Sequence, residues 1–247
     1  AEKLAAIGTP VGATKDAPFV NGLGMKFVPI PIPNSPAGTT ASVLFSIWET
    51  RVQDYEMFAR ETGRVWKKAA SEQGPTHPAA VVSWEEANAF CAWLTGRERQ
   101  AGKLGPQESY RLPSDHEWSC AVGLGERENP RHSPKSKSYG IAKVYPWGAD
   151  YPPPPTAGNY AGLEEVIENR QVQAEKERTG YRDNFPQTAP VGSFAPNALG
   201  VFDLGGNVAE WCADAVEPEQ PNRALRGGSF RNLHPQDLLS STRGVSY

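Results

Sequence analysis

The most informative part of this sequence is GVFDLGGNVAEWCAD (200–214), which is followed after a polar interval by ALRGGSF (224–230). Asp203 and Glu210 place two carboxylates seven residues apart, and the small residues between them let backbone carbonyls approach a common centre. Calcium prefers six to eight oxygen ligands from carboxylates, carbonyls and amides. The pattern therefore suggests a turn around a hard cation followed by a strand, although a capped turn with surface acids would have the same residues.

The composition is typical of a soluble globular protein, because 38% of the 247 residues are hydrophobic and seven are Trp. This length suits one large or two small domains. The 24 Gly and 23 Pro residues favour many turns and long, ordered loops over a helical bundle.

Charge and hydropathy argue against two classes of partner. The net charge of −3, without a basic block that contains aromatic residues, gives no case for nucleic acid. No apolar run approaches the roughly eighteen residues of a membrane helix, so we expect no membrane insertion. The N-terminus lacks the order of a signal peptide, but the chain begins with Ala and a signal could have been removed. Cytoplasmic and surface-displayed locations both stay open.

Three predicted helix starts share the reciprocal capping box, in which Ser or Thr and a Glu or Gln three residues later satisfy two backbone donors. The pairs are Thr50 with Gln53, Ser83 with Glu86, and Ser114 with Glu117. We therefore predict helices over about 51–62, 84–97 and 115–122.

The remaining chain is predicted to contain short strands and long loops. Strands are expected near 25–28 and over 43–50, and Pro29, Pro31 and Pro33 confine the first to a sheet edge or end it. Hydrophobic periodicity largely vanishes over 123–198, except for one polar helix near 164–178, and a loop region this long is usually functional or held together by something. Further strand candidates are 189–194, 200–204 and 224–230. We expect an extended surface arm over 1–18 and one domain over 19–247.

Nine motifs of this sequence together resemble those of a known family. They are NGLGMKFVPIP (21–31), WETRVQDYEMF (48–58), VSWEEANAFCAWL (82–94), YRLPSDHEWSCAV (110–122), YPWG (145–148), GNY (158–160), TAPVGSF (188–194), GVFDLGGNVAEW (200–211) and LRGGSF (225–230). In this order they resemble formylglycine-generating-enzyme-like (sulfatase-modifying-factor) domains over about 20–243. The resemblance implies an α+β fold, the family's variant of the C-type lectin-like fold, with little regular secondary structure, long loops and bound calcium.

The resemblance also implies two structural calcium sites. The ligands of the first correspond to Asp203, the carbonyls of Gly206 and Val208, and Glu210. The ligands of the second correspond to Asn159 and Asp183 with the carbonyls of Tyr160 and Phe185. Two metal ions would hold a Gly/Pro-rich region together where hydrophobic burial is scarce.

Oxidase activity, by contrast, is not expected. The family's oxidase holds copper with two cysteines in the segment that corresponds to 229–243, but this chain has no cysteine after Cys212. Without thiolates no soft Cu(I) site can form there, so we expect no copper. Cys91, Cys120 and Cys212 are interpreted as small buried hydrophobic residues.

The remaining function is recognition of a protein or another macromolecule. The segment after the RGGSF strand offers an aromatic ring, charges of both signs and amides, which suit a recognition surface, although an ordinary polar loop has the same composition. The predicted ligand-binding residues are Phe230, Arg231, Asn232, His234, Gln236, Asp237 and Arg243. Relatives of this kind occur as modules of bacterial signalling kinases and as variable proteins of diversity-generating retroelements, whose variable residues lie in this C-terminal segment.

Two alternatives stay open. The chain could be an enzyme of the same superfamily with an uncharacterised, cysteine-independent activity, because a fold does not fix a function. The family normally continues to a final strand that ends in G-F-R, whereas this chain ends in GVSY (244–247). Either that end has been trimmed or replaced, or an equivalent strand comes from elsewhere.

Overall fold

A five-stranded antiparallel sheet forms the centre of the fold, and the N-terminal strand lies inside it. The computed structural model describes residues 3, 5–7, 12–33, 41–67, 74–164 and 170–245, and within them the strand order is β2-β3-β4-β1-β5. These strands are β1 (Ala5–Ile7), β2 (Phe19–Val20), β3 (Lys26–Ile32), β4 (Ala41–Ser46) and β5 (Ser109–Arg111).

The expected surface arm over 1–18 is only partly correct. Residues 12–18 are mostly exposed, as predicted. However, β1 pairs with both β4 and β5, and Lys3 just before it is fully buried. The prediction is therefore wrong for residues 3 and 5–7, because strand pairing draws them into the domain; residues 1, 2, 4 and 8–11 lie outside the described residues.

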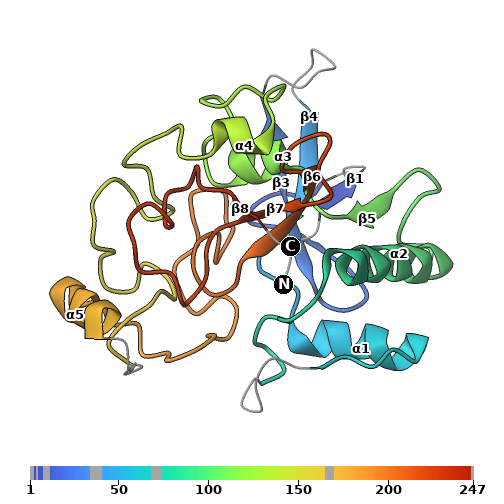
Figure 1. Cartoon of the computed structure of the whole chain (residues 1–247). Coiled ribbons are helices and arrows are strands. Elements are labelled where there is room, and N and C mark those ends of the chain that lie inside the picture. Colours follow the sequence, from blue (N-terminus) through green and yellow to red (C-terminus); the bar gives the residue numbers. More distant parts are fainter. Residues whose placement is uncertain are drawn as a thin grey trace.

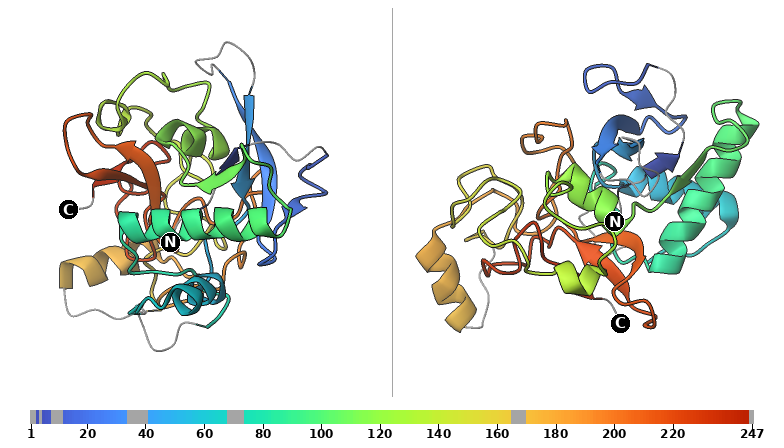
Figure 2. Two further views of the ribbon diagram at one scale, coloured as in Figure 1. Left: turned by 90° about the vertical axis from the view of Figure 1, so that its right-hand side faces the viewer. Right: turned by 90° about the horizontal axis from the view of Figure 1, so that it is seen from above.

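Hydrophobic clusters cover both faces of the sheet, as neighbouring side chains of β4 illustrate. Successive side chains of a strand point to opposite faces. Leu44 packs into the cluster that includes Phe58 of α1 (Val52–Thr62) and Phe90 of α2 (Trp84–Gln100). Phe45 packs on the other side with Trp118 of α3 (Asp115–Ala121). The helices α1 and α2 lie side by side next to the sheet (Figures 1 and 2).

The prolines of β3 occupy an edge, as predicted. Strand β2 pairs with β3 only at Lys26 and Phe27, so Pro29 and Pro31 are paired on one side alone, with β4. A proline has no N–H to donate, and at the edge of the sheet no neighbouring strand requires that hydrogen bond.

Two of the three predicted capping boxes are confirmed. Ser83 and Ser114 accept hydrogen bonds from the N–H groups of Glu86 and Glu117, at 3.2 and 3.1 Å, and these Glu side chains accept in return. The Thr50–Gln53 box is wrong. The first helix begins one residue later, and the Asp54 carboxylate accepts from the N–H of its N-cap, Arg51, at 3.1 Å. Asp54 also forms an ion pair with the Arg51 side chain, which favours this register.

A second, three-stranded sheet contains β6 (Glu210–Ala215), β7 (Arg223–Arg226) and β8 (Gly244–Val245). The candidates 189–194 and 200–204 are not strands. Their backbone donors serve isolated contacts instead: Val191 N–H donates to Thr76 and Phe202 N–H to Ile47, at 2.9 and 2.7 Å. Strand 224–230 is shorter than predicted, because β7 ends at Arg226.

The long loops contain α4 (Pro134–Lys137) and α5 (Arg170–Thr179), and α5 projects from one edge (Figure 1). Residues 165–169 of the predicted 164–178 helix lie outside the described residues. Tyr145, Tyr160 and Tyr181 form a small core with Leu238, so aromatic packing helps to hold these loops together. None of the described helices is long and apolar enough to cross a membrane.

Candidate functional site

The turn around Asp203 and Glu210 closes on the side chain of Lys3. The Lys3 ammonium donates to the backbone carbonyl of Asp203 at 3.1 Å and forms a buried ion pair with Oε1 of Glu210. The second oxygen of Glu210 accepts from the indole N–H of Trp118 at 2.9 Å. The predicted first site therefore does bring Asp203 and Glu210 together, and the structure places an ammonium group between them.

A third carboxylate, Glu49, completes an acidic cluster with Asp203 and Glu210. Glu49 is fully buried; its Oε2 accepts from the Asn207 amide at 3.1 Å, and its Oε1 has no hydrogen-bond partner among the described residues. Burial raises the pKa of Glu49 well above its usual value, and the Asp203 charge adds to this while Lys3 opposes it. Burial likewise raises the pKa of Asp203, whose Oδ2 accepts from the Gly192 N–H at 2.7 Å.

Sequence reasoning missed Asn207, which connects the acidic cluster to the second predicted site. Its amide group bonds to Glu49, and its Oδ1 accepts from the Asn159 amide and the Ala189 N–H, at 3.1 and 2.9 Å. Its backbone carbonyl accepts from Phe230 N–H at 3.0 Å. The sequence feature that could have identified Asn207 is its position between Gly206 and Val208, two of the predicted metal ligands.

The backbone around Asn207 is tightly packed. Gly206 has a φ of +81°, and a Cβ there would lie 2.2 Å from the Asn159 carbonyl oxygen, so only glycine fits. The Gly206 N–H donates to Gly227 at 2.9 Å, and Val208 is buried. These two predicted carbonyl ligands thus lie in a fixed turn beside the acidic cluster.

The second predicted site is a cluster of loop residues that we call the loop site: Asn159, Tyr160, Glu164, Asp183 and Phe185. The Asp183 carboxylate accepts from Tyr160 and Phe185 N–H groups, both at 2.9 Å, so three of the four predicted residues are directly connected. Glu164, which sequence reasoning did not assign to this site, accepts from the N–H of Asp183 at 3.0 Å.

The loop site has more acceptors than donors. Asn159 Oδ1 and Glu164 Oε2 are buried without a hydrogen-bond partner among the described residues. Burial raises the pKa of Asp183 to about 6, with Glu164 acting in the same direction and the two N–H groups opposing. The described residues hold no preformed group of three or more His, Cys, Asp or Glu side chains suited to a metal. A metal here would therefore need the amide and backbone oxygens as well.

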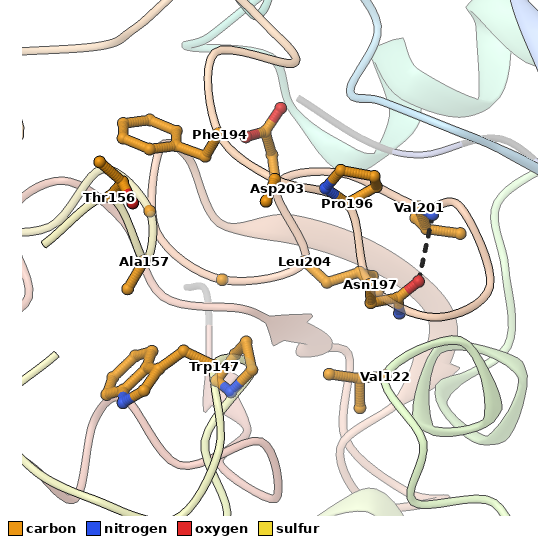
Figure 3. A pocket seen from close by; sticks show the side chains of 14 residues that line it. Val122, Trp147, Thr156, Ala157, Phe194, Pro196, Asn197, Val201, Asp203 and Leu204 are labelled. Carbon is orange, nitrogen blue, oxygen red and sulfur yellow. Dashed lines mark hydrogen bonds between the residues drawn. The ribbon is translucent and has the colours of Figure 1, made fainter. Parts of the chain in front are cut away.

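Beside Asp203 lies a cavity of about 270 Å³. Figure 3 shows Trp147 on one side of it and Phe194 on the other, with Asp203 turned toward the Phe194 side. Asn197 shapes the wall, because its side-chain oxygen accepts from the Val201 N–H at 3.1 Å. The lining mixes apolar side chains with polar groups, among them Thr156, Asn197 and the Asp203 carboxylate.

Most of the predicted ligand-binding residues lie at the surface. Arg231, His234 and Gln236 are exposed, and Phe230 and Asp237 are half-buried; we call these five the recognition face. Arg231 stacks over the Phe230 ring at 5.3 Å. Asn232 has a structural role instead, because its side-chain oxygen accepts from the Ser229 N–H at 2.8 Å and closes the turn.

Arg243 corrects our expectation, because it is not on an exposed face. It is buried and bridges two acids: it donates to both oxygens of Asp115, at 2.9 and 3.0 Å, and to both oxygens of Glu128, at 2.8 and 2.6 Å. Arg226 reaches the same Asp115 at 2.6 Å, and Lys137 also pairs with it. We call these residues the ion network.

The three cysteines are all free and buried, as predicted. Burial raises the pKa of Cys120 to about 12 and that of Cys212 well above its usual value, with acidic neighbours adding to both. Because the thiolate is the reactive and metal-binding form, Cys120 and Cys212 are poor nucleophiles and poor copper ligands.

Comparison with known proteins gives a consistent result. The chain matches the sequence model of the Sulfatase-modifying factor enzyme 1-like domain over residues 14–245. It is 31% identical over 172 residues to the formylglycine-generating enzyme of Bos taurus, a match that covers 63% of this chain and 36% of that protein. It is 33% identical over 155 residues to the inactive C-alpha-formylglycine-generating enzyme 2 of Mus musculus, covering 62% and 37%. The matches thus span less than half of these relatives.

Solved structures share the fold. PvdO from Pseudomonas aeruginosa superposes with a TM-score of 0.54 at 20% identity, covering 91% of this chain and 89% of that chain. Treponema denticola variable protein 1 gives a TM-score of 0.51 at 16% identity, covering 96% and 94%. These likenesses confirm the predicted α+β fold, and at such identities they concern the fold alone.

Proposed function

Because the chain belongs to the sulfatase-modifying factor enzyme 1-like family, we propose that it is a non-catalytic recognition domain with a calcium-stabilised loop frame. The observation that carries this proposal is that the loop bearing the recognition face is anchored to the protein interior at both of its ends. Arg226 and Arg243 stand before and after it in the chain, and both bond to Asp115 inside the protein. A buried ion network therefore closes the base of the loop 227–242, whose outer side chains stay free.

Anchoring the loop in this way favours binding, because a backbone that is already ordered loses less conformational entropy when a partner binds. The Phe230 N–H bonds to Asn207 and the Asn232 side chain closes its own turn, so the loop is also fixed near its middle. Arg231 and His234 contribute no described contact to the core and are exposed. They can change without disturbing the fold, which suits a surface for display.

The buried thiols support the non-catalytic part of the proposal. A copper oxidase needs accessible thiolates, and the chain has no cysteine in the segment after Cys212. The mouse relative described as inactive is compatible with this role, whereas the bovine relative is named as an enzyme.

Calcium fits the loop site chemically. Asp183, Glu164 and Asn159 supply carboxylate and amide oxygens, which are the ligands that calcium prefers, and two of the buried oxygens lack a donor. When bound, calcium would neutralise these carboxylates and cross-link the loop after Gly158 to the loop before Thr188. Chelation should then lower the melting temperature, whereas an unchanged melting curve would contradict the calcium frame.

The binding function can be tested with arrays of proteins and glycans. We expect the purified chain to bind a defined subset, and the triple variant Arg231→Ala, His234→Ala, Gln236→Ala to lose at least about tenfold in affinity, roughly 1.4 kcal/mol. The control is the double variant Gln53→Ala, Arg60→Ala, at two exposed positions of α1. Equal loss in both variants, or no loss in either, would contradict a recognition face at 230–237.

A finer version of the proposal is that 228–247 is the variable region of a diversity-generating retroelement protein. Independent clones from the source organism should then differ within this segment and agree elsewhere. An invariant segment would exclude it.

The rival proposal, a cysteine-independent enzyme, is tested on the same protein. Oxygen consumption or turnover of cysteine-containing peptides, with and without copper, should stay at the level of the buffer. Turnover that survives replacement of all three cysteines by Ala would favour the enzyme over the recognition domain.

A further inference from the structure

We propose that the ammonium group of Lys3, and not a metal ion, is the cation held by the Asp203–Glu210 turn of this chain. The protein would then take up one calcium ion, at the loop site, rather than two. The metal count rests on the calcium part of the proposed function, whereas the position of Lys3 does not.

Lys3 lies where a metal in this turn would lie. Its ammonium contacts the Glu210 carboxylate, a predicted metal ligand, and the backbone carbonyl of Asp203, the residue whose side chain is another predicted ligand. Lys3 and Glu210 are both fully buried. An ammonium in contact with both groups occupies the space between them, and it would repel a second cation a few ångströms away in a medium of low dielectric constant.

The acids of the acidic cluster also have donors of their own. Buried carboxylates are very costly unless a positive charge or hydrogen-bond donors compensate them. Lys3 pairs with Glu210, the Gly192 N–H donates to Asp203, and the Asn207 amide donates to Glu49. Each acid therefore has at least one donor without a metal.

The loop site and the turn differ in how far their buried oxygens are satisfied. At the loop site, oxygens of Asn159 and Glu164 are buried without a donor among the described residues. At the turn, both Glu210 oxygens are satisfied, one by Lys3 and one by the Trp118 indole. The unmet demand for a cation is thus at the loop site, although Glu49 Oε1 keeps one free oxygen in the acidic cluster.

Strand β1 explains how a residue at the start of the chain reaches this position. It is held between β4 and β5, and Lys3 lies two residues before Ala5, its first residue. The ion pair joins residues 207 positions apart. The N-terminal segment thereby contributes both a strand to the central sheet and a counter-ion to the acidic cluster.

Chemical protection of Lys3 tests the proposal directly. The native protein is treated briefly with an amine-acetylating reagent, and the extent at each lysine is read by mass spectrometry. We expect Lys3 to react at least about tenfold more slowly than Lys15, an exposed lysine whose ammonium contacts a backbone carbonyl. Acetylation of Lys3 at the rate of Lys15 would overturn the proposal.

The metal count supplies the second test. After chelator treatment and equilibrium dialysis against calcium, we expect one ion per chain in the wild type, none in Asp183→Asn, and one in Glu210→Gln. Two ions in the wild type, falling to one in Glu210→Gln, would place a metal in the turn and overturn the proposal. No bound calcium with a protected Lys3 would contradict the calcium frame and still support the role of Lys3.

A lysine variant adds a gain-of-function arm. Lys3→Ala removes the ammonium, and we expect the emptied acidic cluster to bind a second calcium ion weakly. Lys15→Ala is the matched control and should keep a count of one. An equal count in the two variants, together with rapid acetylation of wild-type Lys3, would leave the ammonium with no role in the turn.

Discussion

Replacement of Arg243 by Met should lower the free energy of unfolding by about 4 kcal/mol at pH 7, within the range known for breaking a buried ion pair. Met keeps much of the side-chain volume and removes the charge, so the measurement reports on the ion network more than on a cavity. Sequence reasoning placed Arg243 on the exposed recognition face, where its loss would cost little. The substitution therefore distinguishes a buried Arg243 from an exposed one.

The magnitude of this loss follows from the partners that Asp115 and Glu128 keep in the variant. Asp115 retains Arg226 at 2.6 Å and Lys137, whereas Glu128 loses both bonds to Arg243 and keeps, among the described residues, the hydrogen bond from the Ser119 hydroxyl at 2.7 Å. Glu128 must then stay ionised without a cation bonded to it or take up a proton. An ordinary Glu releases its proton near pH 4.3, so protonation at pH 7 costs about 3.7 kcal/mol. Asp115 keeps Arg226 and Lys137, so the bonds lost there add little and the total stays at about 4 kcal/mol.

Urea unfolding of the wild type, Arg243→Met and the control Arg231→Met measures this directly. The exposed control should change the free energy of unfolding by less than about 0.5 kcal/mol. At pH 5 the cost of protonating Glu128 falls to about 1 kcal/mol, so the deficit of Arg243→Met should shrink there. A loss below about 1 kcal/mol at pH 7, combined with loss of binding on the arrays, would refute the buried position of Arg243.

Three further predictions concern the frame. Gly206→Ala should lower the free energy of unfolding by more than about 2 kcal/mol, because the new Cβ meets the Asn159 carbonyl and φ is positive; a melting temperature within one degree of the wild type would contradict this. Burial alone would raise the pKa of Asp115, but the Arg226, Arg243 and Lys137 charges hold it below its usual value. Because the unfolded chain then binds more protons, stability should be present above about pH 4 and lost as the pH falls further; a flat urea midpoint between pH 5 and 2.5 would argue against it. Calcium should raise the melting temperature of the wild type by several degrees relative to excess chelator and leave Asp183→Asn unchanged, and an equal shift in both proteins would place the ion elsewhere.

Local patterns predicted helices α1, α2 and α3 and the burial of the three cysteines, but they did not predict α4. Helices α2 and α3 begin where a Ser and a Glu three residues apart satisfy each other's backbone donors, and this chemistry needs no distant partner. Helix α1 is the exception. Its N-cap is Arg51, because Asp54 can bind both the backbone and the side chain of that residue, whereas the sequence offered Thr50 as an equally good cap.

The motif order also predicted the family, and it named residues that lie close together in the fold, although the ion sites themselves stay predictions. Asp203 with Glu210, and Asp183 with Tyr160 and Phe185, do meet in space. Asp203 and Glu210 are close in sequence, so a local pattern pointed to them, whereas the grouping of Asp183 with Tyr160 and Phe185 came from the family resemblance alone.

Only the tertiary structure decided which side chains are buried and what they neutralise. Arg231 and Arg243 have the same chemistry and lie in the same segment, yet one is exposed and the other bridges Asp115 and Glu128, more than 100 positions away. Lys3 is equally ordinary in the sequence, and its role follows from a strand pairing that carries it to Glu210, 207 positions along the chain. Charges separated by this distance in sequence leave no local pattern, because only the packing of distant elements, such as α3 on strands of both sheets, brings them together.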